Sequence, residues 1–212
     1  MREPRTRRYG QYCGVARALD QIGDRWTLLV IRELLVGPAR YNDLRSGLPG
    51  IATNLLAERL RSLEGHGLVE RRVVPEGGVA YALTPRGADL RPVLDALIRW
   101  SGPLMTTGRD DNDVFRPQWL ALALDALLPR RALPGTSVLL RAGQMNLTLT
   151  GTRAGPSVQL GAPAAPAAVV TAEAPEAFLA VASGAVPLPA AVRAGMVVVS
   201  GDIAIAEQFF GS

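Results

Sequence analysis

Four side chains in the segment "GIATNLLAERLRSLEGHGL", residues 50–68, have types and spacing suited to reading base edges. The leucines recur at the spacing of a buried helical stripe, and the opposite side of the same helix carries Thr53, Asn54, Ala57 and Arg61. Hydroxyl and amide groups can donate to or accept from base edges, a small residue permits close approach, and a guanidinium reaches guanine or phosphate. The face predicts contact with the major groove of DNA, although any one of these residues alone also fits an ordinary solvated position.

The elements around this helix have the order of a winged helix-turn-helix. A short helix near "YNDLRS" and a turn "GLPG" precede it, and two strands, "LVERRVV" and "VAYALT", follow it with "PEGG" at the tip. Further helices are predicted over residues 15–22, from Asp24 as a cap to Gly37-Pro38, and after Thr84-Pro85. In such a motif the second helix enters the major groove and the wing reaches the adjacent backbone or minor groove. We expect a mainly α domain with a β-hairpin wing over residues 1–105.

The predicted DNA-binding residues come from the short helix, the second helix and the wing. They are Arg40, Tyr41, Thr53, Asn54, Ala57, Arg61, Arg71 and Arg72. Glu58 is expected to pair with Arg59 or Arg61 rather than to contact a base.

Charge is divided unevenly along the chain. Residues 1–110 contain 17 arginines and 12 acidic residues, a net charge of +5, whereas residues 111–212 contain 6 and 7, a net charge of −1. Because neutralising phosphates releases counterions and supplies most non-specific affinity for DNA, the first half has the electrostatics of a polyanion binder.

Residue counts argue against several other classes of protein. The chain has 212 residues with one cysteine and one histidine, which rules out an intrachain disulfide and leaves little from which to build a His-rich metal site or a Ser-His-Asp triad. No nucleotide-binding loop or nucleophile with its base is evident, so we expect neither an enzyme nor a cofactor. Arg32 and Glu33 interrupt the longest apolar segment, and no signal core follows the basic N-terminus, which predicts a cytoplasmic protein without a membrane partner.

A dense set of motifs falls in one order between residues 12 and 101: Cys13, "GDRWTLLVIREL", "YNDL", "LPGI", "L.ERL..LE..GLVER" and "Y.LTP.G". Together they resemble the HxlR-type winged-helix transcriptional regulators of bacteria. The resemblance implies a homodimer on a pseudo-palindromic operator, built largely from helices near residues 10–22 and 85–101. The chain departs from that pattern at Gly14, where relatives usually have Pro, and at Ala52, where they often have a capping Ser. We therefore expect the cap to fall to Thr53.

Cys13 has two interpretations. Some members of that family sense electrophiles or oxidants through a cysteine at the corresponding place, which needs an accessible thiol of low pKa. The alternative is a small, half-buried packing residue at the dimer interface. His66 precedes the helix-ending Gly67 and is expected to contact the last carbonyls of its helix rather than to act in catalysis.

Residues 115–212 have a different character and follow a polar segment, 106–114, that is predicted to be a linker. A helix "PQWLALALDALLP" precedes strands in "SVLLRA", "MNLTLTG", "SVQLG" and "AAVVTA". Mixed strands and helices predict an α+β sandwich. The segments "PEAFLAVASG" and "AGMVVVSGDIAIAEQFF" are similar to the helix and closing segment of the sterol-carrier-protein-type fold. That resemblance implies an open sheet backed by helices, with an apolar tunnel between them.

The predicted ligand-binding residues of this sterol-carrier-like domain are Trp119, Leu122, Met145, Leu147, Leu149 and Phe178. Because they bring few charges, the expected guest is a hydrophobic or aromatic small molecule. The alternative is that these side chains fill the core.

The sequence as a whole predicts a multidomain chain that acts as a dimeric DNA-binding regulator, a repressor modulated by a small hydrophobic effector. One alternative is a carrier or sequestering protein for hydrophobic small molecules, which needs no preference among DNA sequences. Another is a regulator whose C-terminal domain is purely structural.

Overall fold

The computed structural model describes residues 8–75, 77–105, 112–131 and 133–211. The chain divides into two compact units, Met1–Leu94 and Asp95–Ser212. The boundary falls inside helix α6 (Arg91–Ser101), so this helix contributes residues to both units. Residues 106–111 of the predicted linker lie outside the described residues.

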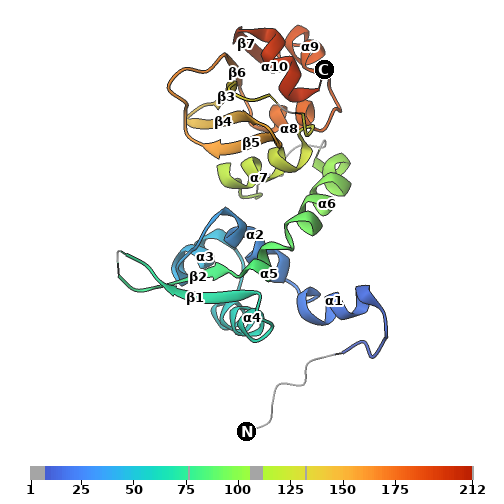
Figure 1. Cartoon of the computed structure of the whole chain (residues 1–212), viewed down its shortest axis with the longest axis vertical. Helices are drawn as coiled ribbons and strands as arrows, with labels where there is room; N and C mark the ends of the chain where they lie inside the picture. Colours follow the sequence, from blue (N-terminus) through green and yellow to red (C-terminus); the bar gives the residue numbers. More distant parts are fainter. Residues whose placement is uncertain (1–7, 76, 106–111, 132, 212) are drawn as a thin grey trace. The chain divides into compact units, whose positions relative to one another are not determined.

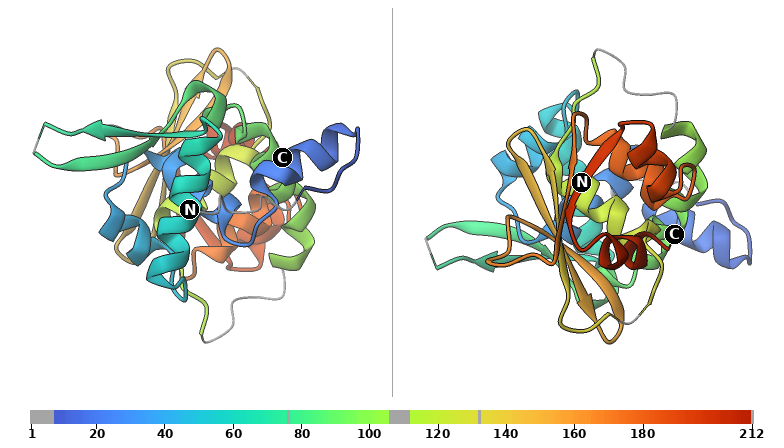
Figure 2. Two further views of the ribbon diagram at one scale, coloured as in Figure 1. Left: turned by 90° about the horizontal axis from the view of Figure 1, so that it is seen from below. Right: turned by 90° about the horizontal axis from the view of Figure 1, so that it is seen from above.

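The N-terminal unit contains helices and one hairpin in the predicted order (Figure 1). They are α1 (Gly14–Ile22), α2 (Thr27–Val36), α3 (Tyr41–Gly47), α4 (Thr53–Gly65), β1 (Val69–Val73), β2 (Val79–Leu83), α5 (Pro85–Ala88) and the start of α6. Strands β1 and β2 are antiparallel, and Figure 2 shows their hairpin extending away from the helices of this unit. Ala39 forms a further antiparallel bridge with Tyr81, which fastens the base of the wing to the segment between α2 and α3.

The leucine stripe of α4 lies in the core of this unit. Leu56, Leu60 and Leu63 are at most 1% exposed and pack in one cluster with Val30 and Ile31 of α2. The helix ends as predicted, because Gly67 has a φ of 68° and the Leu68 amide donates to the Leu63 carbonyl at 2.9 Å. The amphipathic interpretation of this helix is confirmed.

Two helix starts differ from the prediction. The N-cap of α4 is Ala52, without a side-chain cap, and the helix begins at Thr53, so Thr53 does not cap it. The N-cap of α2 is Trp26, not Asp24. The Asp24 carboxylate instead pairs with Arg59, whose side chain is 13% exposed. A guanidinium with so little exposure to water needs an acidic partner. Pairing with Arg59 therefore stabilises the fold more than an Asp24 cap on α2 would.

The expected contact of His66 with the helix carbonyls is wrong. The amides of Gly67 and Leu68 already donate to the carbonyls of Glu64 and Leu63, at 3.0 and 2.9 Å. The Nδ1 atom of the His66 side chain is buried and has no hydrogen-bond partner among the described residues. The expected pairing of Glu58 with Arg59 is confirmed at 3.5 Å.

The C-terminal unit is an α+β structure, as predicted. Its sheet has the strand order β5-β4-β3-β6-β7, in which β3 and β6 are parallel and the other neighbours antiparallel. Its elements after α6 are η1 (Gly102–Met105), α7 (Pro117–Leu127), β3 (Ser137–Ala142), β4 (Met145–Thr152), β5 (Gly155–Leu160), β6 (Ala168–Ala172), α8 (Glu176–Ala182), α9 (Leu188–Arg193), β7 (Val197–Gly201) and α10 (Ile203–Phe210).

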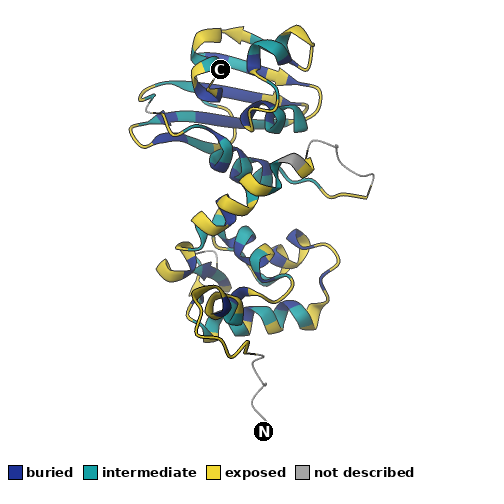
Figure 3. Cartoon of the chain, turned by 90° about the vertical axis from the view of Figure 1, so that its right-hand side faces the viewer, coloured by how far each residue is buried: buried dark blue, intermediate teal, exposed yellow. Residues whose placement is uncertain are grey.

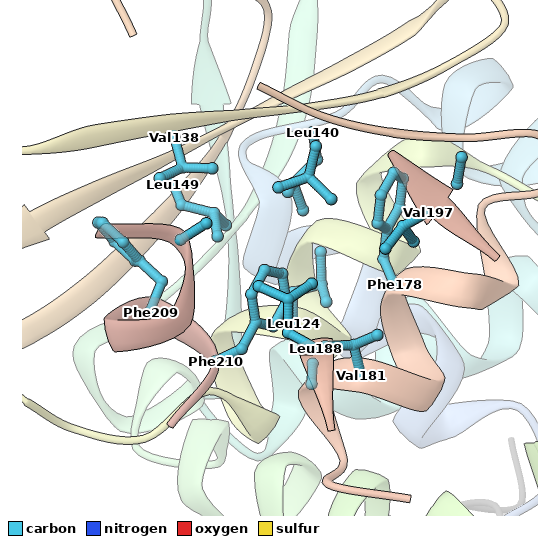
Figure 4. Packing of buried hydrophobic residues seen from close by; sticks show 14 of the residues in the cluster. Leu124, Val138, Leu140, Leu149, Phe178, Val181, Leu188, Val197, Phe209 and Phe210 are labelled. Carbon is cyan, nitrogen blue, oxygen red and sulfur yellow. The ribbon is translucent and has the colours of Figure 1, made fainter. Parts of the chain in front are cut away.

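Helices and sheet share one apolar core in this unit. Figure 4 shows sheet residues such as Val138, Leu140 and Leu149 facing Leu124 of α7 and Phe209 of α10. Figure 3 shows long buried stretches along the central strands. Alternation along β4 places Leu147 and Leu149 in this core.

We predict that Phe178→Ala destabilises the C-terminal unit by about 3–5 kcal/mol, because it leaves a cavity in a packed core. Phe178 is 0% exposed. Amide hydrogen exchange of β3 and β4 reports on this unit alone, and the variant should lose protection there. Val198→Ala is the control, since Val198 is 64% exposed and its truncation should change stability by less than about 0.5 kcal/mol. Unchanged protection in the Phe178 variant would contradict the packing described.

Candidate DNA-binding surface

The first turn of α4 is held in place from two sides. The Tyr41 hydroxyl at the start of α3 donates to the Thr53 carbonyl at 2.7 Å. Buried Leu48 and Ile51 pin the turn between the two helices, and the Ile51 amide donates to the Leu48 carbonyl at 3.1 Å. The start of α4 is therefore fixed relative to α3, as base reading requires.

The outward side of α4 carries polar groups without internal partners. Thr53 and Asn54 are exposed, and within the described part of the chain neither side chain makes a hydrogen bond. Ala57 is half-buried, and the exposed Arg61 bonds only weakly to its own helix, from Nε to the Ala57 carbonyl at 3.2 Å. The predicted face thus has its donors and acceptors free for a ligand.

Arg40 joins this surface to the wing. Its guanidinium is exposed and donates from Nη2 to the Gly77 carbonyl near the wing tip at 2.8 Å. Its backbone amide donates to the Asp43 carboxylate at 3.2 Å, which fixes the residue at the start of α3. One positive charge therefore stands between the helix-turn-helix and the hairpin.

The two wing arginines are held differently. Arg71 pairs with Glu64 of α4, with 2.8 Å between Nε and Oε1, and lies over the Tyr81 ring at 5.5 Å. The hydrogen bond to Glu64 raises the pKa of the Arg71 guanidinium. Arg72 pairs with Glu70 of its own strand at 2.5 Å. Both pairs are partly exposed and therefore weak, so an anionic ligand can replace either carboxylate.

One basic residue on α3 was not predicted. Arg45 is exposed and lies four residues after Tyr41, hence on the same side of that helix. The spacing of four residues between Tyr41 and Arg45 in "YNDLRS" could have predicted from the sequence that Arg45 lies on this side of α3.

Comparisons with known proteins match this part of the chain. The model of the family described as HxlR-like helix-turn-helix matches residues 21–108. An uncharacterised HTH-type transcriptional regulator of Synechocystis, sll1512, is 42% identical over 90 residues, which are 42% of this chain and 67% of that protein. The HTH-type transcriptional regulator YodB of Bacillus subtilis is 37% identical over 93 residues, 43% of this chain and 83% of YodB. The chain belongs to the HxlR-like helix-turn-helix family.

A solved structure of one relative was also found. The crystal structure of quinone-bound YodB from Bacillus subtilis is 35% identical, with a TM-score of 0.38, and the match covers 42% of this chain and 96% of that one. The relatives named here are transcriptional regulators, and a DNA-binding regulator is the activity they support for this HxlR-like chain.

Cys13 of the HxlR-like unit is exposed and immediately precedes α1. Hydrogen bonds from the backbone amides of Ala16 and Val15 lower the pKa of its thiol. The free amides at the start of a helix stabilise a thiolate over a thiol.

Four of the six predicted ligand-binding residues lie in the core of the C-terminal unit or pack against it. Leu147, Leu149 and Phe178 are in the packed core, Met145 packs against it, and Leu122 is buried. Trp119 is half-buried and lies under Arg116, 5.9 Å from the guanidinium carbon to the ring centre. A cavity of about 640 Å³ has none of the six in its lining.

Other kinds of site find no support among the described residues. No group of three or more His, Cys, Asp or Glu there is arranged to hold a metal ion. None of the described helices combines the length and the apolar composition needed to cross a bilayer.

We predict that the face of α4 and the wing contribute differently to DNA binding. Asn54→Ala and Arg61→Ala should weaken specific binding by about 1–3 kcal/mol while changing non-specific binding little, whereas Arg72→Ala should weaken both. Fluorescence anisotropy with operator and unrelated duplexes, at several salt concentrations, measures both affinities. Equal losses for the three variants on both duplexes would show that the helix face does not read bases.

We predict that Cys13 reacts faster with iodoacetamide at neutral pH in the folded protein than in urea. The lowered pKa leaves a larger thiolate fraction at pH 7, so the midpoint of the pH–rate profile should lie below that of the unfolded chain. The single cysteine makes the measurement unambiguous by mass spectrometry. Identical midpoints in the two states would refute the effect of the α1 amides.

Proposed function

We propose that the chain is a homodimeric transcriptional repressor that binds a pseudo-palindromic operator through α4 and the wing. The observation that carries the proposal is the outward face of α4, where Thr53 and Asn54 are exposed with no side-chain partner among the described residues. Short polar groups at the start of a recognition helix are the groups that meet base edges. The same helix carries the exposed Arg61, and the exposed Arg40 lies at the start of α3.

Exposed apolar side chains support the dimer. Tyr12, Val15 and Leu19 lie exposed on and beside α1, and Trp100 of α6 is 75% exposed. Exposed apolar side chains that gather on one helix mark interaction sites. Both helices carry exposed stretches (Figure 3), and they are the two that the family resemblance assigns to the dimer.

The C-terminal unit supports control by a small molecule. We propose that it is a sterol-carrier-like module whose occupant releases the repressor from DNA. The occupant can do so only if the DNA-bound and DNA-free states differ in their affinity for it. Helix α6 offers a route, because Leu94 packs in the core of the N-terminal unit while Ile98 and Ser101 line the C-terminal cavity.

The cavity also favours a second candidate, a carrier of small apolar molecules. A carrier needs the cavity but not the polar face of α4. Sequence preference on DNA separates the two functions.

The experiment is a gel shift at about 150 mM salt with the DNA upstream of the chain's own gene and a shuffled duplex of the same composition. A repressor should bind its operator about 10³-fold or more tightly than the shuffled DNA. The Asn54→Ala variant is the matched control, and it should lower this ratio without unfolding the protein. Equal affinity for both duplexes would reject the regulator and leave the carrier.

A further inference from the structure

Helix α1 joins the core of the N-terminal unit at its C-terminal end. All residues of α1 are described, and of their side chains Ile22 alone belongs to the core cluster that holds the leucines of α4. Nearer the start of α1, Val15 is 68% and Leu19 is 42% exposed. The direction of α1 therefore depends on residues 21–26, the corner at which the chain turns from α1 into α2.

An ion pair links this corner to the middle of α4. The Asp24 carboxylate pairs with the Arg59 guanidinium. The side chain of Arg59 is 13% exposed and that of Asp24 is 65% exposed, so the acid reaches the helix from the solvent side. Because a charge with so little access to water depends on its partner, the pair holds the corner against α4.

A second link joins α1 to the end of α4 through Arg86 of α5. The Nη2 atom of Arg86 donates to the side-chain oxygen of Gln21 at 2.8 Å, and its Nη1 atom donates to the His66 carbonyl at 2.9 Å. One guanidinium thus bridges the last turn of α1 and the C-cap of α4. Its planar fork of donors holds both acceptors in one geometry.

The backbone of the corner is held in a costly conformation. Trp26 has a φ of 78°, a left-handed value that residues with a side chain rarely adopt. Its ring packs against the core cluster, and a Cβ at Gly50, in the turn before α4, would lie 3.8 Å from that ring. Such a conformation persists where the surrounding contacts enforce it, so the corner is not a flexible connection.

The end of α4 is fixed to α5 as well, and α5 leads into α6. The Thr84 hydroxyl donates to the Gly67 carbonyl at 2.7 Å, and a Cβ at Gly87 would lie 2.0 Å from the Leu68 carbonyl oxygen. Backbone contact this close leaves α5 no room to shift against the end of α4. Both helices of the proposed dimer are thus connected to α4, α6 through closely packed backbone and α1 through side chains.

The group on α4 that receives the ion pair does not lie on the side proposed to meet DNA. Arg59 is two residues from Ala57 and two from Arg61, which places it about 200° around the helix from either. Removing the pair therefore changes how α4 is held without removing a base contact.

We propose that Gln21, Asp24, Arg59 and Arg86 fix the angle between α1 and α4 and thereby set the spacing of the operator half-sites that the dimer accepts. In a twofold dimer, the separation of the two recognition helices follows from the orientation of each relative to the dimer contacts, and half-site spacing mirrors it. The four are positioning residues, since they act through α4. The inference rests on the proposed function, because it needs a dimer and a pseudo-palindromic operator.

The test uses operators that differ only in the number of base pairs between the half-sites. Footprinting of the upstream DNA that the wild-type protein binds identifies the half-sites, and duplexes are then made with one or two base pairs added or removed between them. One base pair moves a half-site by about 3.4 Å and rotates it by about 35°. Fluorescence anisotropy should show that the wild-type protein loses affinity by about ten-fold or more at each altered spacing.

The double variant Gln21→Ala/Asp24→Asn breaks both links and leaves the DNA-facing side of α4 intact. It should remain a dimer by analytical ultracentrifugation and bind all spacings within about three-fold of one another. Asp24→Glu keeps a carboxylate for Arg59 and should retain the wild-type preference. Arg130→Gln is the matched control, because it removes a paired guanidinium of the C-terminal unit, and it should also retain that preference.

Two outcomes would overturn the proposal. One is a double variant that prefers the same spacing as strongly as the wild-type protein. The other is a variant that binds every operator more weakly by the same factor, which would show that the links only stabilise the fold. If the double variant does not fold, Gln21→Ala alone leaves the Arg59 pair intact and should still weaken the preference. A wild-type protein without sequence preference would instead reject the proposed function, on which this inference rests.

Discussion

Burial of the leucine stripe determines which side of α4 is free to meet DNA. Leu56, Leu60 and Leu63 are each worth about 1.5–3 kcal/mol when fully buried, so rotating the helix about its axis would cost a large part of a domain's stability. The hydrogen bond from Tyr41 to the Thr53 carbonyl adds a fixed point at the start of the helix. Rotation and position are both set before any DNA is present, which is the pre-organisation that specific binding needs.

In the C-terminal unit, helices α7 and α8 contribute residues both to the sheet core and to the lining of the cavity. Leu124 of α7 and Phe178 of α8 lie in the sheet core, whereas Leu127 and Leu179 of the same helices pack against that core and also line the cavity. A native core is close-packed and admits no guest without rearrangement. The cavity and the core therefore share part of their walls.

The features predictable from the sequence were those that depend on neighbours along the chain. The α4 stripe, its glycine end and the strands β3, β4 and β6 follow from periodicity and turn residues.

The errors concern side chains whose partners lie elsewhere in the sequence. Asp24 is taken by Arg59 of another helix, and the carbonyls assigned to His66 are taken by the Gly67 and Leu68 amides. The six residues predicted to bind a ligand stay a prediction, and three of them, Leu147, Leu149 and Phe178, lie in the packed core. The sequence did not predict helix α9, because Pro187 and Pro189 interrupt the apolar pattern of this short segment.

The ion pairs of the wing have a consequence for how binding responds to its ionic surroundings. Arg71 and Arg72 are accompanied by Glu64 and Glu70, so these carboxylates serve as counterions built into the protein. In the proposed complex a phosphate would displace them; the DNA would still release its cations, but the freed carboxylates would attract cations from solution in exchange. The wing therefore contributes less to the net release of ions than two unpaired arginines would. Recognition that relies on it tolerates changes in cellular salt better than the count of arginines alone indicates.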